Sequence, residues 1–337
     1  MPGTKIALLL TSEMGERLFS DEARERLERL GKATPQARGE MLPARWTEGL
    51  LRERIAGARV AVTSWGTPVL TKAVLDAAPE LGLIAHAAGS VRAVATEEVW
   101  KRGIRVTSGA AAIAVGVAET ALGFMLTGVK RVWELNRATH AGKWPTALDE
   151  KGADFYDVTI GVVGASHVGR HVLKLLANFG VKALLYDPYV DAEGARELGA
   201  TKADLPTLMR EADVVTLHAP AIESTRGMIT RELIRSMKDG ALLVNTARGA
   251  LLDEPALIEE LSTGRIRACL DVTDPEPPPA DSPLRKLENV VLTPHVAGTV
   301  GKGARRIGEL AIREIERFLR GEPALHEVRA EDLARLA

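Results

Sequence analysis

The stretch VTIGVVGASHVG, Val158 to Gly169, decides the fold of this chain. Its apolar start, Val158–Val163, predicts a buried strand, and a turn with two glycines follows at once. The spacing of apolar residues then predicts a helix from His167 to Phe179, and a second apolar run predicts a strand over Val181–Tyr186. A strand, a helix and a strand in this order indicate a parallel α/β sheet with helical crossovers.

The same alternation continues on both sides of this stretch. Downstream, four apolar runs predict strands that complete a nucleotide-binding sheet: Val214–Leu217, Leu242–Asn245, Ala268–Val272 and Val290–Thr293. Upstream, runs at Ile6–Leu10, Val60–Val62 and Leu83–Ala85 alternate with charged amphipathic segments and suggest a second parallel sheet. A chain of 337 residues is long enough for both, so we predict an α/β protein with two Rossmann-like domains.

Two longer helices frame the second sheet in this prediction. Apolar residues at helical spacing predict a helix from Val117 to about Asn136, which could bridge the two domains. The last predicted helix runs from Lys302 to Phe318 and stops before Gly321. It could return to the first domain.

The turn after Val163 has the features of a dinucleotide-binding fingerprint. Gly164 can form the tight turn and Gly169 can let the helix pack on the strand, while His167 and Val168 would offer backbone amides to a pyrophosphate. Ser166 stands where the usual motif has its middle glycine, and its side chain narrows the approach of a diphosphate. The alternative is a turn that is only structural.

Asp187 follows the second strand and completes the pattern. A carboxylate at this point can accept hydrogen bonds from the adenosine ribose hydroxyls and would repel a 2'-phosphate. The sequence therefore favours NAD over NADP. The alternative is that Asp187 only opens the turn Asp187-Pro188.

Three later strands each end in a segment with reactive side chains. Arg248 can hold a substrate carboxylate and polarise a neighbouring ketone, and His295 can donate a proton to the carbonyl oxygen as a hydride arrives. Glu276, if paired with His295, would favour the imidazolium. Each residue alone has an ordinary structural explanation, but the set fits the reduction of a 2-oxo acid.

Composition excludes several other functions. With 44 basic and 45 acidic side chains the formal net charge is −1, so neither nucleic acid nor a membrane is expected as a partner. Cys269 is the single cysteine and lies in an apolar run, which excludes an intramolecular disulfide and a thiolate metal cluster and fits a reducing cytoplasm. The run Ile6–Leu10 is too short for a signal peptide or a membrane span, and no metal site is expected.

The chain resembles the D-isomer-specific 2-hydroxyacid dehydrogenases. The resemblance extends from about Val60 to Gly321. Its motifs are Gly89-Ser90-Val91, Gly103-Ile104-Arg105-Val106-Thr107, Val117-Ala118-Glu119, the modified fingerprint, Leu217-His218-Ala219-Pro220, Met237-Lys238, Asn245-Thr246-Ala247-Arg248-Gly249, Leu270-Asp271-Val272, Glu276-Pro277 and Thr293-Pro294-His295.

This resemblance implies a discontinuous substrate domain, residues 1–107 and 300–337, with an NAD-binding domain, 108–299, inserted into it and an active site in the cleft between them. It implies the catalytic residues Arg248, Glu276 and His295, and a homodimer to which the region from Thr120 to Trp144 contributes. The implied substrate contacts are Trp65, Gly66, Ala88, Gly89 and Arg248. The implied cofactor contacts are Gly164, Ser166, His167, Val168, Gly169, Asp187, Ala219, Pro220, Thr246, Ala247, Asp271, His295 and Gly298, with Asp271 on the nicotinamide amide.

The segment Thr63–Thr67 points to the substrate. Phosphoglycerate-specific relatives usually have arginines here, and this chain has Trp65 instead, although Arg92 or another cation could compensate. We therefore expect an NAD-dependent dehydrogenase for small unphosphorylated 2-oxo or 2-hydroxy acids, such as a glyoxylate or hydroxypyruvate reductase. The alternatives are a phosphoglycerate dehydrogenase-like enzyme and a non-enzymatic NAD sensor, which the serine at 166 would suit. Glu276 weighs against a formate dehydrogenase, because that branch has glutamine there.

Overall fold

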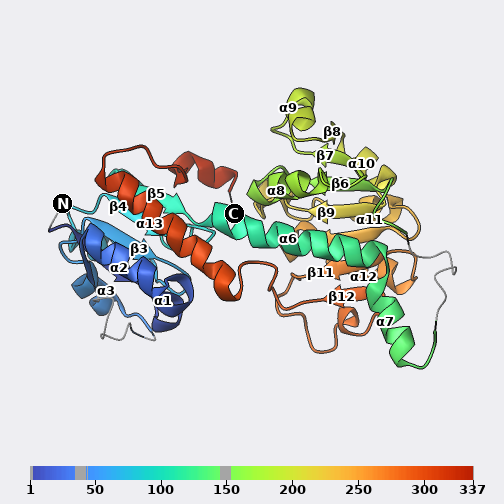
Figure 1. Ribbon diagram of the computed structural model, residues 1–337, viewed down its shortest axis with the longest axis horizontal. Coiled ribbons are helices and arrows are strands. Elements are labelled where there is room, and N and C mark those ends of the chain that lie inside the picture. Colours follow the sequence, from blue (N-terminus) through green and yellow to red (C-terminus); the bar gives the residue numbers. More distant parts are fainter. Residues whose placement is uncertain (1–2, 35–42, 44, 145–152, 337) are drawn as a thin grey trace. The chain divides into compact units, whose positions relative to one another are not determined.

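The chain forms two compact units in a computed structural model that describes residues 3–34, 43, 45–144 and 153–336 (Figure 1). Unit 1 is made of Met1–Ile113 and Thr299–Ala337, and unit 2 of Ala114–Gly298. Both units are built on mainly parallel sheets, which confirms the predicted fold class. The predicted domain boundaries, at 107/108 and 299/300, lie a few residues from these divisions.

Unit 1 holds a six-stranded sheet in the order β13-β5-β4-β3-β1-β2. All pairs are parallel except β13 with β5. The strands are β1 (Lys5–Leu9), β2 (Lys32–Thr34), β3 (Val60–Thr63), β4 (Leu83–His86), β5 (Arg105–Ser108) and β13 (Glu327–Val328). The α-helices are α1 (Ser12–Leu18), α2 (Asp21–Leu30), α3 (Glu48–Ile55), α4 (Lys72–Asp76), α5 (Glu97–Lys101) and α13 (Arg305–Leu319).

Helices cover both faces of this sheet. Side chains of α1, α2 and α13 share one apolar core with β1, β3 and β4, and those of α3, α4 and α5 share another on the opposite face. The strands are therefore apolar almost throughout, as expected for a parallel sheet between two helical layers. The predicted last helix begins as a 3-10 turn, Gly301–Ala304, before α13.

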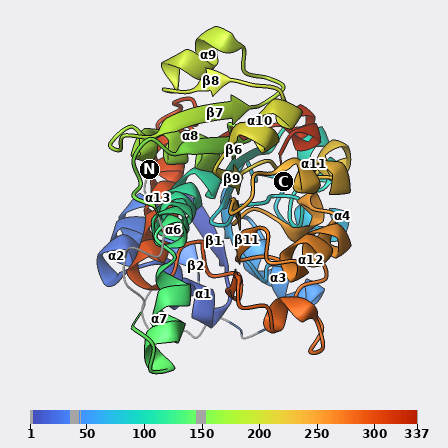
Figure 2. The same ribbon diagram turned by 90° about the vertical axis from the view of Figure 1, so that its right-hand side faces the viewer.

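Unit 2 holds a seven-stranded parallel sheet in the order β12-β11-β10-β9-β6-β7-β8, part of which can be followed in Figure 2. The strands are β6 (Thr159–Val163), β7 (Lys182–Tyr186), β8 (Thr201–Lys202), β9 (Val214–Leu217), β10 (Leu242–Asn245), β11 (Arg267–Leu270) and β12 (Val290–Leu292). The α-helices that begin within it are α7 (Val132–His140), α8 (His167–Leu176), α9 (Ala192–Glu197), α10 (Leu205–Glu211), α11 (Arg231–Ser236) and α12 (Glu254–Ser262).

The strand order of unit 2 reverses beside β6. From β6 the chain builds outward through β7 and β8, and then returns to add β9 to β12 on the other side. Ligands of open α/β sheets bind outside the carboxyl ends of the strands at such a reversal. Val163, Leu217 and Asn245 are register partners across the sheet, so the loops after β6, β9 and β10 start at one edge.

One predicted helix is wrong. The expected single helix from Val117 to Asn136 is two helices, α6 (Ala110–Val129) and α7, because Arg131 takes a left-handed conformation with φ 58°. By length and composition α6 is apolar enough to span a membrane, but half of its most apolar window is buried. Its Ala118, Ala121 and Met125 pack in the core under β6, which is the behaviour of a core helix.

Candidate active site

The turn between β6 and α8 has room only for glycine at two positions. Gly164 has φ 99°, in the left-handed region that favours glycine. A Cβ there would lie 2.6 Å from the backbone nitrogen of Ala219, and a Cβ on Gly169 would lie 1.9 Å from the carbonyl oxygen of Gly164. Both distances are far below van der Waals contact, so this geometry requires the glycines of the fingerprint.

Ser166 is the N-cap of α8. Its Oγ accepts a hydrogen bond from the backbone nitrogen of Gly169 over 3.4 Å. His167 and Val168 open the helix, so they belong to the N-terminal turn whose dipole favours an anion. From the sequence, Ser166 was expected to narrow the approach of a diphosphate and to contact the cofactor. Its capping role was not predicted, although a serine directly before a predicted helix is the usual signal for a cap.

Asp187 lies against the same turn. Its Oδ2 accepts a hydrogen bond from the backbone nitrogen of Ala165 over 2.7 Å, and its Oδ1 accepts one from Tyr189 over 2.8 Å. The carboxylate is thus fixed at the end of β7 beside the glycine-containing turn. This is a position from which it can meet a ribose bound at that turn.

Two buried polar atoms at the strand ends have no hydrogen-bond partner within the described part of the chain. They are Nδ1 of His218, after β9, and Oγ1 of Thr246, after β10. The other ring nitrogen of His218 lies 2.9 Å from Oγ1 of Thr216, and burial lowers the pKa of this histidine to about 3, so the ring is neutral. Buried polar groups normally have hydrogen-bond partners. Unpartnered atoms at the edge that carries the β6–α8 turn therefore fit a bound polar cofactor such as NAD.

Arg248 stands on a turn that Asn245 shapes. The buried side chain of Asn245 accepts a hydrogen bond from the backbone nitrogen of Ala247 over 3.0 Å and donates one to the carbonyl oxygen of Arg248 over 2.9 Å. Arg248 itself is exposed, and one of its terminal nitrogens donates to the carbonyl oxygen of Ala247 over 2.6 Å. The guanidinium has no ion pair with a carboxylate among the described residues, so its charge is available to an anionic ligand.

Glu276 and His295 are in direct contact. Oε1 of Glu276 lies 2.6 Å from Nδ1 of His295, and both side chains are partly exposed. His295 has φ 54°, which is uncommon for a residue with a side chain. Because Nδ1 faces the carboxylate, Nε2 is the ring nitrogen through which His295 can exchange a proton with a ligand.

Asp271 holds the loop that carries His295. Its buried carboxylate accepts hydrogen bonds from the Thr293 hydroxyl over 2.6 Å and from the backbone nitrogens of Val296 and Ala297 over 2.9 and 2.8 Å. The sequence analysis assigned Asp271 to the nicotinamide amide, and that contact stays a prediction. The contacts within the chain show that Asp271 also shapes the turn of His295.

Two residues connect the Arg248 loop with the loop that leads to Glu276. A Cβ on Gly249 would lie 2.1 Å from the carbonyl carbon of Thr273, so the two backbones touch. Glu254 accepts a hydrogen bond from the backbone nitrogen of Asp274 over 2.9 Å, and burial raises the pKa of this carboxyl group. Glu254 was not predicted from the sequence, because its partner lies 20 residues away and no motif indicates the contact.

The predicted substrate residues of unit 1 follow two neighbouring strands. Ser64, after β3, donates its hydroxyl to the carbonyl oxygen of Ala87 over 2.8 Å, which joins the Trp65-Gly66 turn to the turn after β4. The carbonyl oxygens of Ala88 and Gly89 accept from Gly109 and from the Ser108 hydroxyl, over 2.8 and 2.5 Å. A carboxylate bound at this turn would need its N–H groups, because a carboxylate only accepts hydrogen bonds.

The remaining predicted contacts lie at the same strand edge of unit 2. Leu270 is a register partner of both Asn245 and Leu292, so the loops after β10, β11 and β12 also leave one edge. This edge brings together the residues that follow those strands and β9: Ala219, Pro220, Thr246, Ala247, Arg248, Asp271, His295 and Gly298.

Within the described ranges, no group of three or more histidine, cysteine or acidic residues could hold a metal ion.

The profile of the "D-isomer specific 2-hydroxyacid dehydrogenase, NAD binding domain" matches residues 122–297, more than half of the chain. The chain belongs to the D-isomer-specific 2-hydroxyacid dehydrogenases. This confirms the family and the NAD-binding domain predicted from the sequence. The matched region contains the glycine turn, Asp187, Arg248, Glu276 and His295.

Two relatives show the breadth of this dehydrogenase family. The chain is 37% identical over 280 residues to a D-3-phosphoglycerate dehydrogenase of Methanocaldococcus jannaschii, covering 82% of this chain and 53% of that protein. It is 38% identical over 251 residues to a hydroxypyruvate reductase of Thermotoga maritima, covering 73% of this chain and 80% of that protein. The chain thus spans about half the length of the first relative and most of the second.

A solved structure shows the same fold over nearly the whole chain. The D-lactate dehydrogenase of Lactobacillus jensenii, solved with NAD+, has a TM-score of 0.80 and 24% identity, and the match covers 96% of this chain and 99% of that one. At this identity the likeness shows the fold alone.

Proposed function

We propose that the protein is an NAD-dependent oxidoreductase that transfers a hydride between NAD(H) and the α carbon of a small, unphosphorylated 2-oxo or 2-hydroxy acid, as glyoxylate and hydroxypyruvate reductases do. The observation that carries this proposal is the contact of 2.6 Å between Glu276 and His295 at a strand edge shared with Arg248. A carboxylate on one ring nitrogen leaves the other for proton transfer, which is the arrangement that reduction of a carbonyl needs.

The three side chains take different roles in this reaction. Arg248 binds the substrate carboxylate through its planar fork and places positive charge near the carbonyl group. His295 donates a proton from Nε2 to the carbonyl oxygen, and Glu276 keeps the ring oriented and stabilises its protonated form. In the oxidation direction His295 takes the proton back.

The cofactor residues are those of the β6 to α8 turn and of the neighbouring strand ends. When bound, NADH supplies the hydride. The N-terminal turn of α8, with His167 and Val168, would hold the pyrophosphate, and Asp187 would accept the ribose hydroxyls and disfavour NADPH. Thr246 and Ala247 would line the same edge.

The alternative of a phosphoglycerate dehydrogenase rests on the relatives of that name. Against it stand Trp65 in the loop after β3 and the absence of an arginine from Thr63–Thr67. Arg92, which could have compensated, donates instead to the carbonyl oxygens of Leu333 and Leu336. A pure NAD sensor is disfavoured, because binding alone needs neither a proton donor nor its carboxylate partner.

The direct test is oxidation of NADH by the purified protein with a panel of 2-oxo acids: glyoxylate, hydroxypyruvate, pyruvate and 3-phosphohydroxypyruvate. We expect turnover with unphosphorylated acids, and turnover lower by about 10²- to 10⁴-fold in a His295→Asn control. A clear preference for 3-phosphohydroxypyruvate would favour the alternative. NADH binding without turnover of any 2-oxo acid would favour a sensor.

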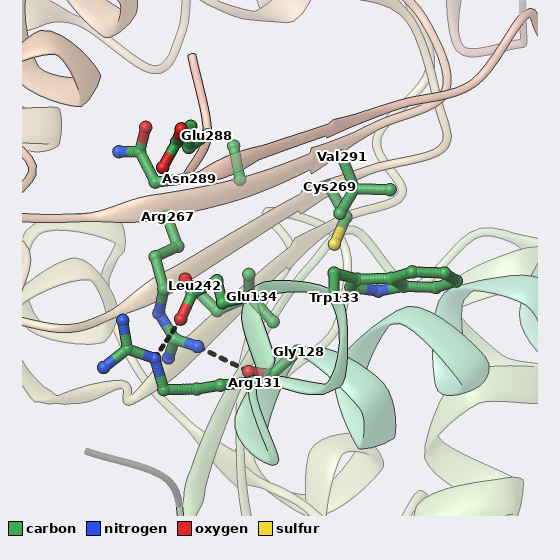
Figure 3. Close-up of a pocket in the computed structure, with 11 residues that line it drawn as sticks. Gly128, Arg131, Trp133, Glu134, Leu242, Arg267, Cys269, Glu288, Asn289 and Val291 are labelled. Carbon is green, nitrogen blue, oxygen red and sulfur yellow. Dashed lines mark hydrogen bonds and ion pairs between the residues drawn. The ribbon is translucent and has the colours of Figure 1, made fainter. Parts of the chain in front are cut away.

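We further infer a homodimer that forms through α7. No side chain of this helix is buried, and Val132, Trp133 and Leu135 are all exposed. Trp133 and Glu134 line a hollow with Cys269 and Val291 of the unit 2 sheet (Figure 3). An apolar helix surface of this kind is typical of a subunit contact.

Light scattering coupled to gel filtration tests the dimer. The protein should elute with twice the mass of one chain, and Leu135→Asp should shift it to the monomer, whereas Leu325→Asp, an equally apolar exposed site in unit 1, should not.

We also place the protein in the cytoplasm. Its buried thiol Cys269, whose pKa burial raises to about 12, fits a reducing compartment.

A further inference from the structure

Arg17 lies on the ring of Trp65. Its guanidinium carbon is 5.8 Å from the centre of the indole ring, and the tryptophan is 42% exposed. Trp65 is in the predicted substrate loop, whereas Arg17 is in the last turn of α1 and far away in the sequence. The segment Thr63–Thr67 itself contains no cation, and the cation beside Trp65 comes from another element.

A hydrogen bond fixes the position of this arginine. A terminal nitrogen of Arg17 donates to the carbonyl oxygen of Thr299 over 2.8 Å. Within the described ranges no carboxylate forms an ion pair with Arg17. The guanidinium has five N–H donors and this hydrogen bond uses one of them, so a positive charge with spare donors is held over an exposed aromatic ring.

The place of this arginine in the fold is where a ligand of unit 1 is expected. The helix that carries it starts directly after β1, and its capping residue Thr11 would lie 3.5 Å from a Cβ on Gly66. The strands β1, β3 and β4 are adjacent and parallel, so α1, the Trp65-Gly66 turn and the turn of Gly89 all follow carboxyl ends at one sheet edge. Parallel sheets bind ligands at this edge.

We propose that Arg17, stacked on Trp65, is a specificity-determining residue that binds a second carboxylate at the distal end of the substrate. This rests on the proposed function and narrows its preferred substrates to 2-oxo acids with a second carboxylate, a group that glyoxylate and hydroxypyruvate lack. A planar carboxylate matches the guanidinium fork and can lie beside the indole ring. The charge of Arg17 is then neutralised by the ligand.

The test compares two acids of equal chain length, 2-oxoglutarate and 2-oxopentanoate, which differ only in a terminal carboxylate. We expect the wild type to have the higher kcat/KM with 2-oxoglutarate. In Arg17→Met the ratio of the two kcat/KM values should fall by about 10- to 100-fold, since a hydrogen bond to a charged group contributes about that factor. Arg17→Lys should fall between the two.

Arg59→Met is the matched control. Arg59 stacks on Phe318 at 5.5 Å and directly precedes β3, at the opposite end of the strand from Trp65. Its loss removes the same charge from the same unit, but at the end of β3 away from Trp65. The ratio of the two kcat/KM values should therefore stay unchanged. Equal thermal midpoints and equal NADH affinities would show that the variants are folded.

Four outcomes would overturn the proposal. A wild type that prefers 2-oxopentanoate, or an unchanged ratio in Arg17→Met while the enzyme reduces 2-oxo acids, would remove Arg17 from substrate recognition. If Arg17→Met lowered only the ratio of kcat/KM for 3-phosphohydroxypyruvate to kcat/KM for hydroxypyruvate, the group that Arg17 binds would be a phosphate and not a carboxylate. A wild type that reduces no 2-oxo acid would instead overturn the proposed function, and this inference with it.

Discussion

His295 donates its backbone N–H to the carbonyl oxygen of Asp271 over 2.9 Å, and the carboxylate of the same aspartate holds the two residues that follow His295. The left-handed conformation of His295 is thus fixed by contacts that do not involve its ring. A substitution that tolerates this conformation therefore removes the imidazole and leaves the turn in place.

Loss of the imidazole should lower turnover by about 10²- to 10⁴-fold, the range for a positioned general acid. Alanine is strained at the φ of 54°, whereas asparagine tolerates it, so His295→Asn separates lost chemistry from lost stability. Both variants should bind NADH normally by fluorescence titration. Glu276→Gln should be milder, because it keeps a partner for Nδ1 and loses only the charge. Near-parental hydride transfer in His295→Asn, measured in single turnovers, would exclude the proton-donor role.

Arg248→Ala should behave differently from the histidine variants. In the proposed mechanism the charge of Arg248 both binds the substrate carboxylate and stabilises negative charge on the ketone oxygen. Its loss should therefore raise KM and lower kcat together. Steady-state kinetics with NADH at saturation separate the two constants. A change in kcat with an unaltered KM would mean that another group binds the carboxylate.

Asp187 should set the preference for NADH. Its two carboxylate oxygens are fixed by Ala165 and Tyr189, so they cannot turn away from an added 2'-phosphate. The wild type should have a higher kcat/KM with NADH than with NADPH, and Asp187→Ser should reduce this preference by removing the negative charge. Equal use of both cofactors by the wild type would contradict the assignment.

Ser166→Gly tests whether the capping serine limits cofactor binding. Replacing an N-cap serine by glycine costs only a few tenths of a kcal/mol, so the fold should survive. The added space should let the pyrophosphate approach the backbone and tighten NADH binding. Weaker binding in a calorimetric titration would show that the hydroxyl itself contacts the phosphate.

The sequence was sufficient for most strands of both sheets, because buried parallel strands leave short apolar runs that end where β6, β9 and β10 end. It did not predict β2, β5, β8 or β13. It was not sufficient for the break at Arg131, since apolar spacing continues from α6 into α7 across one left-handed residue. The sequence did not predict the roles of Glu254 and Arg17 for a related reason. Their roles depend on Asp274 and Thr299, partners that only the folded chain brings near them.

Acid should destabilise the protein through two buried histidines. Burial lowers the pKa of His218 to about 3 and that of His86 to about 4, from the ordinary 6.5. At a pH between the lowered pKa of the folded chain and 6.5, these histidines bind protons in the unfolded chain and not in the folded chain. The stability that comes from keeping them neutral is therefore complete above pH 6.5 and is lost as the pH falls. At pH 5 the loss is about 2 kcal/mol for each histidine.

Urea unfolding at pH 7 and pH 5 measures this loss. In His86→Gln the loss over this pH interval should be roughly half that of the wild type, because only His218 remains of the two. Carboxyl groups with lowered pKa, such as that of Glu316 beside Arg26, contribute mainly at lower pH. A free energy of unfolding that is the same at both pH values would show that these histidines are protonated in the folded chain.

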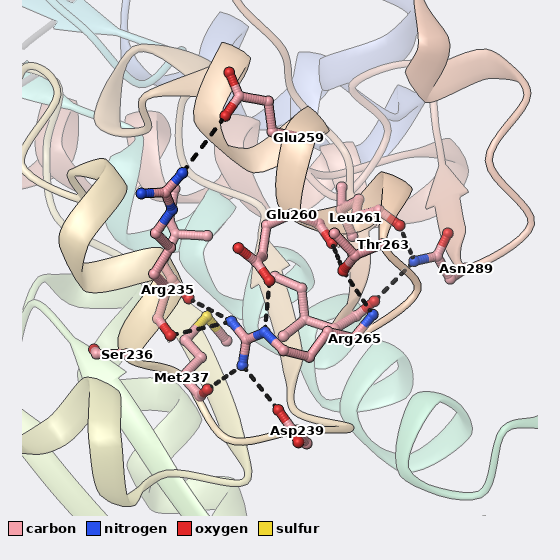
Figure 4. A network of polar contacts seen from close by, with 12 residues as sticks. Arg235, Ser236, Met237, Asp239, Glu259, Glu260, Leu261, Thr263, Arg265 and Asn289 are labelled. Atoms are coloured by element: carbon pink, nitrogen blue, oxygen red, sulfur yellow. Dashed lines mark hydrogen bonds and ion pairs between the residues drawn. The ribbon is translucent and has the colours of Figure 1, made fainter.

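Arg265 should be important for the stability of unit 2. Its guanidinium contacts Glu260 of α12 over 2.5 Å and Asp239 over 3.3 Å, and it donates to the carbonyl oxygens of Ile234, Arg235 and Met237 at the end of α11 (Figure 4). Arg265→Met removes these hydrogen bonds, of which those to Glu260 and to the carbonyl oxygens of Ile234 and Met237 are partly buried. The free energy of unfolding should fall by about 1 to 3 kcal/mol.

Arg235 in the same network is the control. It meets Glu259 at 4.0 Å with both side chains more than half exposed, and exposed ion pairs contribute little. Arg235→Met should therefore leave the midpoint of urea unfolding almost unchanged, while Arg265→Met lowers it and leaves NADH affinity at the wild-type value. If the two variants lose equal stability, the acceptors around Arg265 are satisfied by water, and the link between α11 and α12 lies in their apolar contacts instead.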